Sequence, residues 1–351
     1  MNVRFRELDA LRGVASLLVV FFHFTMGRSQ AEYGFKYGVA GVDLFFIISG
    51  FVIFMSITKV SSTKEFLVNR ISRLYPTYWT CVMITFLMQI IVGFYMPSKA
   101  VPSLLDLLGN LTMFQFYLNI KDIDGPYWTM IVEMLFYLLI ALFFATRKLN
   151  AFIPFGVIMI VFIILNDLWL EPLYPNLMLI HQGFPLINHL PLFLSGIVFY
   201  KLVTESYNPG QHIGYYFFLL CCYIAQLLLF DNGGQSASRI TLYHYTFVLA
   251  FFYLLFILFS LKMLGFLVNK YTLFFGKISF AIYLIHQYIS AEVIIPGLIK
   301  YLDFNFWIAS GIALFITVSL AAAITYLIEI PLGKMMNAWL RRMTGLPARA
   351  A

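Results

Sequence analysis

The fold is decided by residues 9–24, DALRGVASLLVVFFHF, an apolar stretch that nevertheless carries Asp9, Arg12, Ser16 and His23. At about 100° per residue, Arg12 and His23 return to one face of a helix, about 16 Å apart along its axis. Asp9 and Ser16 fall on the same stripe. Unpaired polar groups are costly in hydrocarbon, so this stripe must face a partner or a wet cavity. Arg12 alone could anchor the helix at the inner headgroups, but that alternative leaves His23 unexplained.

The composition places this stretch in a membrane protein. Of the 351 residues, 62% are hydrophobic and only 11% are charged, and the mean hydropathy is +0.87. Soluble domains carry about 25% charged residues. We therefore predict an all-α, polytopic bundle that forms one membrane-embedded domain, residues 1–351, in contact with lipid. The net charge of +7 is explained by basic loops and does not indicate nucleic-acid binding.

Hydropathy predicts about ten transmembrane helices, each of about 20 residues. The predicted spans are 8–27, 38–57, 74–96, 127–146, 151–168, 184–202, 212–230, 241–262, 278–298 and 306–328. The run 104–119 is shorter and more polar, so we expect it to be interfacial or re-entrant. With the N-terminus inside, 17 of the 23 Lys and Arg residues fall on the inner side, as the positive-inside rule requires. Both termini are then cytoplasmic.

The cysteines predict neither a disulfide framework nor a metal site. Cys81, Cys221 and Cys222 lie inside apolar runs and form no CxxC pair, so they read as small core residues. The first apolar run ends without a small-residue cleavage site, which argues against a cleavable signal peptide.

Two motifs follow the first span. The sequence GVDLFF, residues 41–46, places Asp43 at the outer start of the second span, near the depth of His23. A carboxylate bound to one imidazole nitrogen raises the basicity of the other, so we predict that Asp43 orients His23 as a general base. Asp43 could instead bond only interfacial water. Arg70 and Arg73 share a helix face at the inner mouth of the third span. They could clamp phosphates or simply anchor the topology.

Two later spans carry further polar residues. Glu133 and Tyr137, at i and i+4 in the fourth span, can face one cavity, and an intramembrane Glu is a functional candidate. The alternative is a structural hydrogen bond to a neighbouring helix. Tyr283 and His286 share a face with Ser279. His286 could contact substrate or bond across helices.

Taken together, these motifs resemble the membrane acyltransferase-3 family, which includes O-antigen and other surface-glycan acetylases. The matching pieces occur in order: LDALRG with Arg12 and, after ten intervening residues, His23; GVDLFF with Asp43; Arg70 and Arg73; Trp128 followed by Glu133; Tyr283 and His286; and Glu329 with Pro331. They extend over nearly the whole chain. The soluble esterase-like domain of some family members is not expected here.

The resemblance implies transfer of an acyl group, most often acetyl, from cytoplasmic acyl-CoA to a hydroxyl of a glycan or lipid-linked sugar at the outer face. It implies a bacterial inner-membrane enzyme that uses acetyl-CoA and no metal. The expected catalytic residues are His23, Asp43 and Glu133. The expected donor-binding residues are Arg12, Arg70 and Arg73. The expected substrate contacts are Trp128, Tyr137, Tyr283 and His286.

The main alternative is a proton-coupled exporter of a sugar or lipid, because intramembrane His, Asp and Glu also suit proton relays. The paired inner arginines and the lack of an internal repeat favour the enzyme. The sequence does not determine the oligomeric state or the identity of the acceptor.

Overall fold

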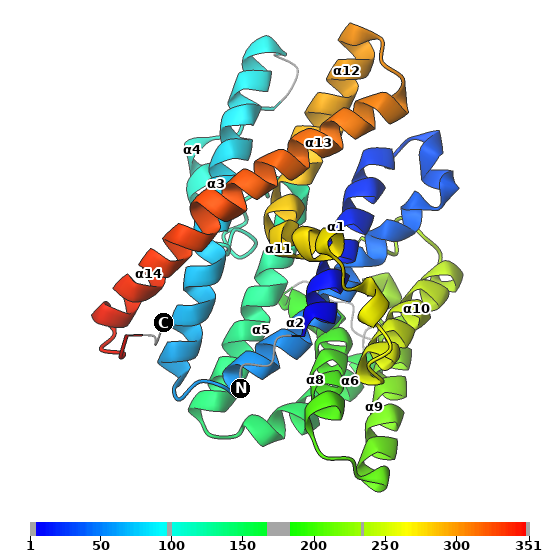
Figure 1. The fold of residues 1–351 in the computed structure, drawn as a ribbon, viewed down its shortest axis with the longest axis vertical. Helices are drawn as coiled ribbons and strands as arrows, with labels where there is room; N and C mark the ends of the chain where they lie inside the picture. The colour runs from blue at the N-terminus through cyan, green and yellow to red at the C-terminus, as the bar shows by residue number, and fades with distance from the viewer. Residues whose placement is uncertain (1–4, 97–99, 167–182, 233–234, 349–351) are drawn as a thin grey trace.

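The computed structural model describes residues 5–96, 100–166, 183–232 and 235–348, and every regular element in these ranges is a helix. Nine of the described helices are long and apolar enough to cross a membrane. They are Arg6–Thr25, Phe35–Ile57, Thr63–Tyr95, Gly125–Ala145, Pro185–Thr204, Pro209–Leu228, Leu242–Ser260, Lys270–Leu302 and Phe306–Met343. The prediction of an all-α polytopic bundle is confirmed. Helices α1 and α3 begin on the lower side of Figure 1, where α14 ends.

Two predicted segments differ from these nine helices. The predicted span 151–168 corresponds to α6 (Phe152–Leu165), a shorter apolar helix, and residues 167–182 that follow it lie outside the described part. The run 104–119 contains α4 (Leu104–Leu111). Its eight residues extend only about 12 Å, too short to cross a bilayer.

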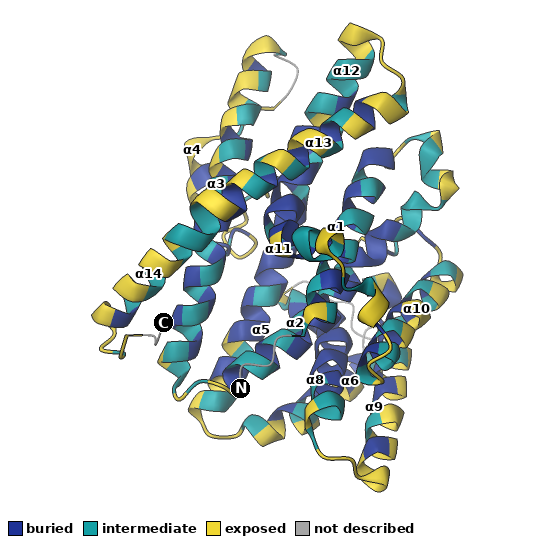
Figure 2. Cartoon of the chain, viewed as in Figure 1, coloured by how far each residue is buried: buried dark blue, intermediate teal, exposed yellow. Residues whose placement is uncertain are grey.

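The centre of the bundle consists of two closely packed helix pairs. Helix α1 (Arg6–Thr25) lies against α11 (Lys270–Ile285), and α2 (Gly41–Ile57) lies against α8 (Leu190–Thr204). A Cβ at Gly276 would collide with the backbone carbonyl of Asp9 on α1. These four helices are mostly buried, whereas α9 (Pro209–Leu228), α10 (Leu242–Ser260) and α13 (Phe306–Ile324) expose large apolar side chains (Figure 2).

The second pair, α2 and α8, meets through glycines from both helices. A Cβ at Gly50 would collide with the carbonyl of Phe193, and one at Gly196 with the carbonyl of Ile47. Small residues let membrane helices approach to backbone contact, where van der Waals packing is strongest. The sequence therefore holds α1 and α2, the helices that carry Arg12, His23 and Asp43, against fixed partners.

Two helices widen into π-helical turns. One is η10 (His286–Ile294), which follows α11 and leads into α12 (Ile295–Leu302); the other is η11 (Thr325–Glu329), between α13 and α14 (Ile330–Met343). Each precedes a proline, Pro296 or Pro331, in the first turn of the next helix. A proline has no N–H and its ring clashes with the carbonyl four residues earlier, so the preceding backbone must deviate from α geometry. Such turns occur frequently at functional sites.

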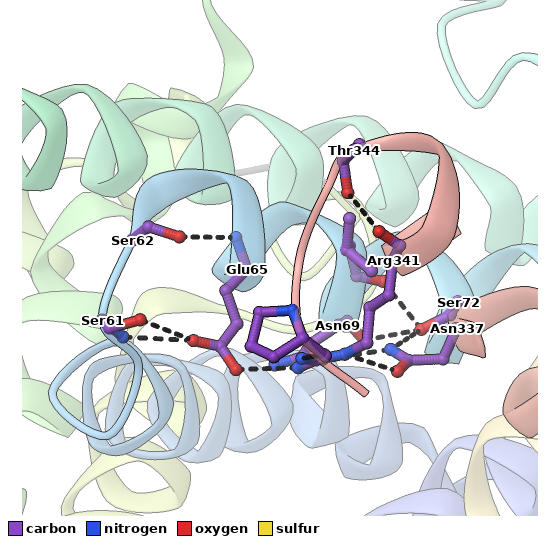
Figure 3. Close-up of polar contacts among 10 residues, drawn as sticks. Ser61, Ser62, Glu65, Asn69, Ser72, Asn337, Arg341 and Thr344 are labelled. Carbon is purple, nitrogen blue, oxygen red and sulfur yellow. Dashed lines mark hydrogen bonds and ion pairs between the residues drawn. The ribbon is translucent and has the colours of Figure 1, made fainter. Parts of the chain in front are cut away.

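A buried arginine ties α14 to α3 (Thr63–Tyr95), as Figure 3 shows. The Nη2 atom of Arg341 lies 2.7 Å from Oε1 of Glu65, and its Nε donates to Oδ1 of Asn337 at 3.0 Å. Asn337 in turn donates to the hydroxyl of Ser72 at 2.9 Å. This contact holds α14 against the turn of α3 next to Arg73. We call these residues the α3–α14 clamp.

Candidate active site

The first cavity lies among α1, α2, α3, α5 (Trp128–Ala145) and α11. Its polar lining includes the following predicted residues: Arg12, Arg70, Arg73, Glu133, Tyr137 and Tyr283. We call it the arginine cavity. The structure thus brings together all three arginines predicted to bind the donor, although Arg12 is far from the other two in the sequence.

The arginine cavity carries excess positive charge. Glu133 accepts hydrogen bonds from the hydroxyls of Tyr137, at 2.5 Å, and Ser49, at 3.4 Å. The guanidinium of Arg70 lies 5.7 Å from the ring centroid of Tyr137. Arg12 lies close enough to Asp9, Glu133 and Glu329 for their charges to interact. The three guanidinium groups outnumber Glu133, the one carboxylate among the described residues that line this cavity, and this excess favours an anionic ligand.

Glu329 balances part of this charge. Its carboxylate accepts a hydrogen bond from the hydroxyl of Thr325 at 3.3 Å and is close enough to Arg12 and Arg73 for their charges to interact. Glu329 closes the η11 π-helix, which explains why the Glu-x-Pro motif stands at this place. The sequence interpretation noted the motif but gave Glu329 no role in the site.

The second cavity contains His23. It is also lined by Asp43, Trp128, His189, Ser236 and Tyr283, and we call it the histidine cavity. Val42 and Tyr283 line both cavities, so the two spaces adjoin at these side chains. The hydroxyl of Tyr283 donates to Thr129 Oγ1 at 3.0 Å, which fixes the ring between the cavities.

His23 is held by a second histidine. Its Nδ1 lies 2.9 Å from the carbonyl of Val19 and 2.9 Å from Nε2 of His286. Nδ1 of His286 lies 2.8 Å from the carbonyl of Tyr283. Since a carbonyl only accepts hydrogen bonds, both Nδ1 atoms carry the proton. His23 then donates to His286, and its own Nε2 keeps a free lone pair, as a general base requires.

The predicted hydrogen bond between Asp43 and His23 is replaced by these contacts. Asp43 is buried, and Tyr245 and Ser236 lie beside its carboxylate. Nδ1 of His189 lies 3.9 Å from Asp43 Oδ1. Hydropathy indicated the depth of Asp43 correctly, but the direction in which its side chain leaves α2 depends on the packing against α8 and α10. His189 was missed because it precedes an apolar helix and forms no motif.

His286 lines neither cavity; it contacts His23 instead. Of the two roles considered for His286, the structure shows the hydrogen bond to another helix. Trp128 lines the histidine cavity, where its ring centroid lies 5.7 Å from that of His189. Among the described residues, no group of three or more His, Cys, Asp or Glu side chains is arranged to hold a metal ion.

A buried carboxylate positions the segment that carries His286. Asp124 Oδ1 accepts hydrogen bonds from the backbone N–H of Gly125 at 2.8 Å and of Tyr288 at 3.2 Å. These bonds join the start of α5 to the η10 π-helix. Burial raises the pKa of Asp124 well above its usual range.

Two observations therefore define the class of this protein: a polytopic membrane bundle, and a buried site in which an arginine cavity adjoins a histidine cavity. The sequence model of the acyltransferase domain, acyltransferase-3 type, matches residues 5–326. The chain belongs to the acyltransferase-3 family and is an integral membrane protein.

Two curated relatives are similar to the chain. "Putative acetyltransferase ORF330" of Acidianus two-tailed virus is 25% identical over 297 residues, which are 80% of this chain and 82% of the relative. "Exopolysaccharide production protein ExoZ" of Rhizobium meliloti (strain 1021) is 32% identical over 118 residues, which are 30% of this chain and 34% of the relative. No solved structure matches the chain significantly.

Proposed function

We propose that the protein transfers an acyl group, most often acetyl, from cytoplasmic acyl-CoA to a hydroxyl of a glycan or lipid-linked sugar. The observation that carries this proposal is the meeting of the two cavities at Val42 and Tyr283. One cavity is suited to an anionic donor, and the other contains a base. A transfer reaction needs both, with the reacting carbonyl at the boundary between them.

The arginine cavity is the proposed donor site. Coenzyme A carries phosphate groups, and guanidinium groups bind phosphate through charge-assisted, bidentate hydrogen bonds. Arg12, Arg70 and Arg73 supply three such groups in one place. The pantetheine arm would extend from them toward Tyr283, which brings the thioester close to the histidine cavity.

The histidine cavity is the proposed acceptor site. Nε2 of His23 takes the proton of the acceptor hydroxyl while the oxygen attacks the thioester carbonyl. A C–O bond forms, the C–S bond breaks, and the CoA thiolate leaves with the proton returned by the imidazolium. Asp43 and His189 lie in the same cavity and supply polar contacts for the acceptor. An acyl-histidine intermediate on His23 is the less favoured variant.

The orientation follows from the basic residues. With 17 of 23 Lys and Arg inside, the arginine cavity opens toward the cytoplasm and the histidine cavity toward the outer face. Reporter fusions at Asp231 and Val268 should then give opposite readouts. The same readout at both positions would contradict this orientation. The names of the two relatives, an acetyltransferase and an exopolysaccharide production protein, support acetyl as the transferred group and a polysaccharide as the acceptor.

Purified protein incubated with acetyl-labelled acetyl-CoA tests the proposal. Release of CoA that depends on an added glycan, with the label recovered on that glycan, supports the enzyme. Transport of a sugar into proteoliposomes without consumption of acetyl-CoA would support the proton-coupled exporter instead.

A further inference from the structure

A third cavity lies beside the histidine cavity, and the function proposed above does not use it. It is formed by the loop between α4 and α5 together with the first turns of α5. Gln115, Asn119, Lys121 and Asp122 provide its polar groups, and Phe116 and Trp128 provide aromatic rings. Trp128 also lines the histidine cavity. The two cavities therefore adjoin at Trp128, and we call the third one the loop cavity.

The loop that forms this cavity is fixed by hydrogen bonds although it contains little regular structure. Asn110, which is fully buried, donates through Nδ2 to the carbonyl of Lys121 at 2.8 Å and accepts from the N–H of Ile123 at 3.0 Å. Gln89 on α3 donates to the carbonyl of Ile123 at 2.5 Å. Loops held in this way by a rigid scaffold commonly carry binding residues.

The polar groups of the loop cavity are positioned in advance. Nε2 of Gln115 donates to Oδ1 of Asp122 at 2.7 Å, which fixes that carboxylate. Within the described residues, its other oxygen makes no hydrogen bond. Aromatic residues and a lysine at a membrane surface are often only an interfacial belt. A belt does not require a buried amide to shape the loop, or a buried glutamine, Gln115, to hold the exposed carboxylate of Asp122.

These groups suit a sugar residue. Amide, carboxylate and ammonium groups together offer the donors and acceptors that several hydroxyls need, and an aromatic ring offers an apolar surface to the C–H face of a sugar. The charges of Lys121 and Asp122 cancel, whereas a phosphate would call for an excess of basic groups. The ligand that fits best is therefore a neutral sugar.

We infer that the loop cavity is a second acceptor subsite, which binds the sugar residue next to the one that is acylated in the histidine cavity. This inference rests on the proposed function, because it assumes that the acceptor is a glycan. A saccharide chain that occupies both cavities passes over Trp128. The enzyme then selects chains of at least two sugar residues.

The inference is tested by glycan binding in the absence of acetyl-CoA. Purified protein is applied to an array of neutral and anionic microbial oligosaccharides that range from single sugars to hexasaccharides. We expect binding of neutral chains of two or more residues in preference to the single sugars. Asp122→Ala and Lys121→Met should weaken that binding by about tenfold or more, as for the loss of one charged hydrogen bond. The matched control is Glu32→Ala, which removes an exposed carboxylate outside the three cavities.

Three results would overturn the inference: equal binding by the Asp122→Ala protein and the wild type, equal binding of single sugars and chains, or no binding to any member of the array. Preferred binding of anionic chains would replace the neutral sugar by a charged one and would also contradict it. Glycan binding is measured without the donor, so it does not depend on acyl transfer. A protein that binds glycan here but transfers no acyl group in the separate assay with acetyl-CoA would refute the proposed function and leave the subsite in place.

Discussion

His23 and His286, which are separated by 263 positions in the chain, meet at 2.9 Å through Nδ1 of the first and Nε2 of the second. The carbonyl of Tyr283 fixes the proton on Nδ1 of His286. The carbonyl of Val19 and Nε2 of His286 both accept from Nδ1–H of His23 and fix its proton there. Enzymes often use a carboxylate to orient a histidine base. Here backbone carbonyls and the neutral imidazole of His286 orient the histidine base, and they add no buried charge.

His286→Leu removes one of the two acceptors for Nδ1–H of His23 and leaves only the carbonyl of Val19. The imidazole is then held less firmly and loses part of the electron density at Nε2, so we expect kcat to fall by about 10²-fold with the KM for acetyl-CoA unchanged. The pH dependence of kcat should also move. His286→Gln places an amide oxygen near the position of Nε2 and should restore both readouts in part. If the Leu and Gln variants have the same pH profile as the wild type, His286 has only a packing role.

His23→Ala should lower acyl transfer by about 10²–10⁴-fold, the usual contribution of a general base. Acetyl-CoA binding should be retained, because His23 lies outside the arginine cavity. His23→Gln should be equally inactive since an amide cannot take the proton. In an acyl-histidine mechanism, label from acetyl-CoA would remain on the wild-type protein when acceptor is withheld. Substantial transfer by folded His23→Ala protein would refute both mechanisms.

Arg70→Ala and Arg73→Ala should each weaken acetyl-CoA binding by about 1.5–3 kcal/mol, the value of a charged hydrogen bond. Binding by the wild type should also weaken as salt rises. Equilibrium binding of labelled acetyl-CoA at several salt concentrations measures both effects. Arg342→Ala is the matched control because Arg342 is exposed at the end of α14. If both variants bind acetyl-CoA with wild-type affinity, Arg70 and Arg73 only anchor the topology of the protein in the membrane.

Arg341→Ala should destabilise the protein through the α3–α14 clamp. Glu65, Asn69 and Asn337 then lose the guanidinium that they bind. Because Glu65 is partly exposed, we expect a loss of about 1.5–3 kcal/mol, the value of a charged hydrogen bond. Thermal unfolding in detergent measures the loss, again against Arg342→Ala. Because the clamp lies next to Arg73, acetyl-CoA binding should weaken as well. An unchanged melting temperature would show that the clamp contributes little.

Asp124 should make stability depend on pH. Burial raises its pKa in the folded state, so the folded protein holds this proton more tightly than the unfolded chain does. The resulting stabilisation is complete below the ordinary Asp pKa, near 4, and is lost as the pH rises through the folded pKa. Asp124→Asn mimics the protonated form and should remove this part of the pH dependence. Identical melting curves across pH for both proteins would contradict it.

The sequence was sufficient for the fold class because about 20 apolar residues are needed to span a membrane. It was less informative where helices do not follow hydropathy. Helix α3 begins at Thr63, well before the predicted span at residue 74, because polar residues remain helical at the membrane surface. The π-helices were not predicted either, although each precedes a proline.

In the site, sequence periodicity indicated which residues share a helix face but not which faces meet. The common stripe of Arg12 and His23 is divided between two cavities, and Asp43 turns to Tyr245 instead of His23. His189 had no spacing that linked it to the motifs, and the motif that contains Glu329 gave this residue no role in the site. Pairings between helices depend on tertiary packing, so the partnership of His23 with His286 could only be seen in three dimensions.

The glycine contacts have a consequence for motion. Where the backbones of α1 and α11 touch at Gly276, and those of α2 and α8 at Gly50 and Gly196, no side chain lies between them that could change rotamer to absorb a displacement. Each pair must therefore move as one rigid body. Passage of a large substrate then requires each pair to separate from the neighbouring helices. Aromatic side chains at these boundaries, such as Tyr283, have to rotate to let the substrate pass.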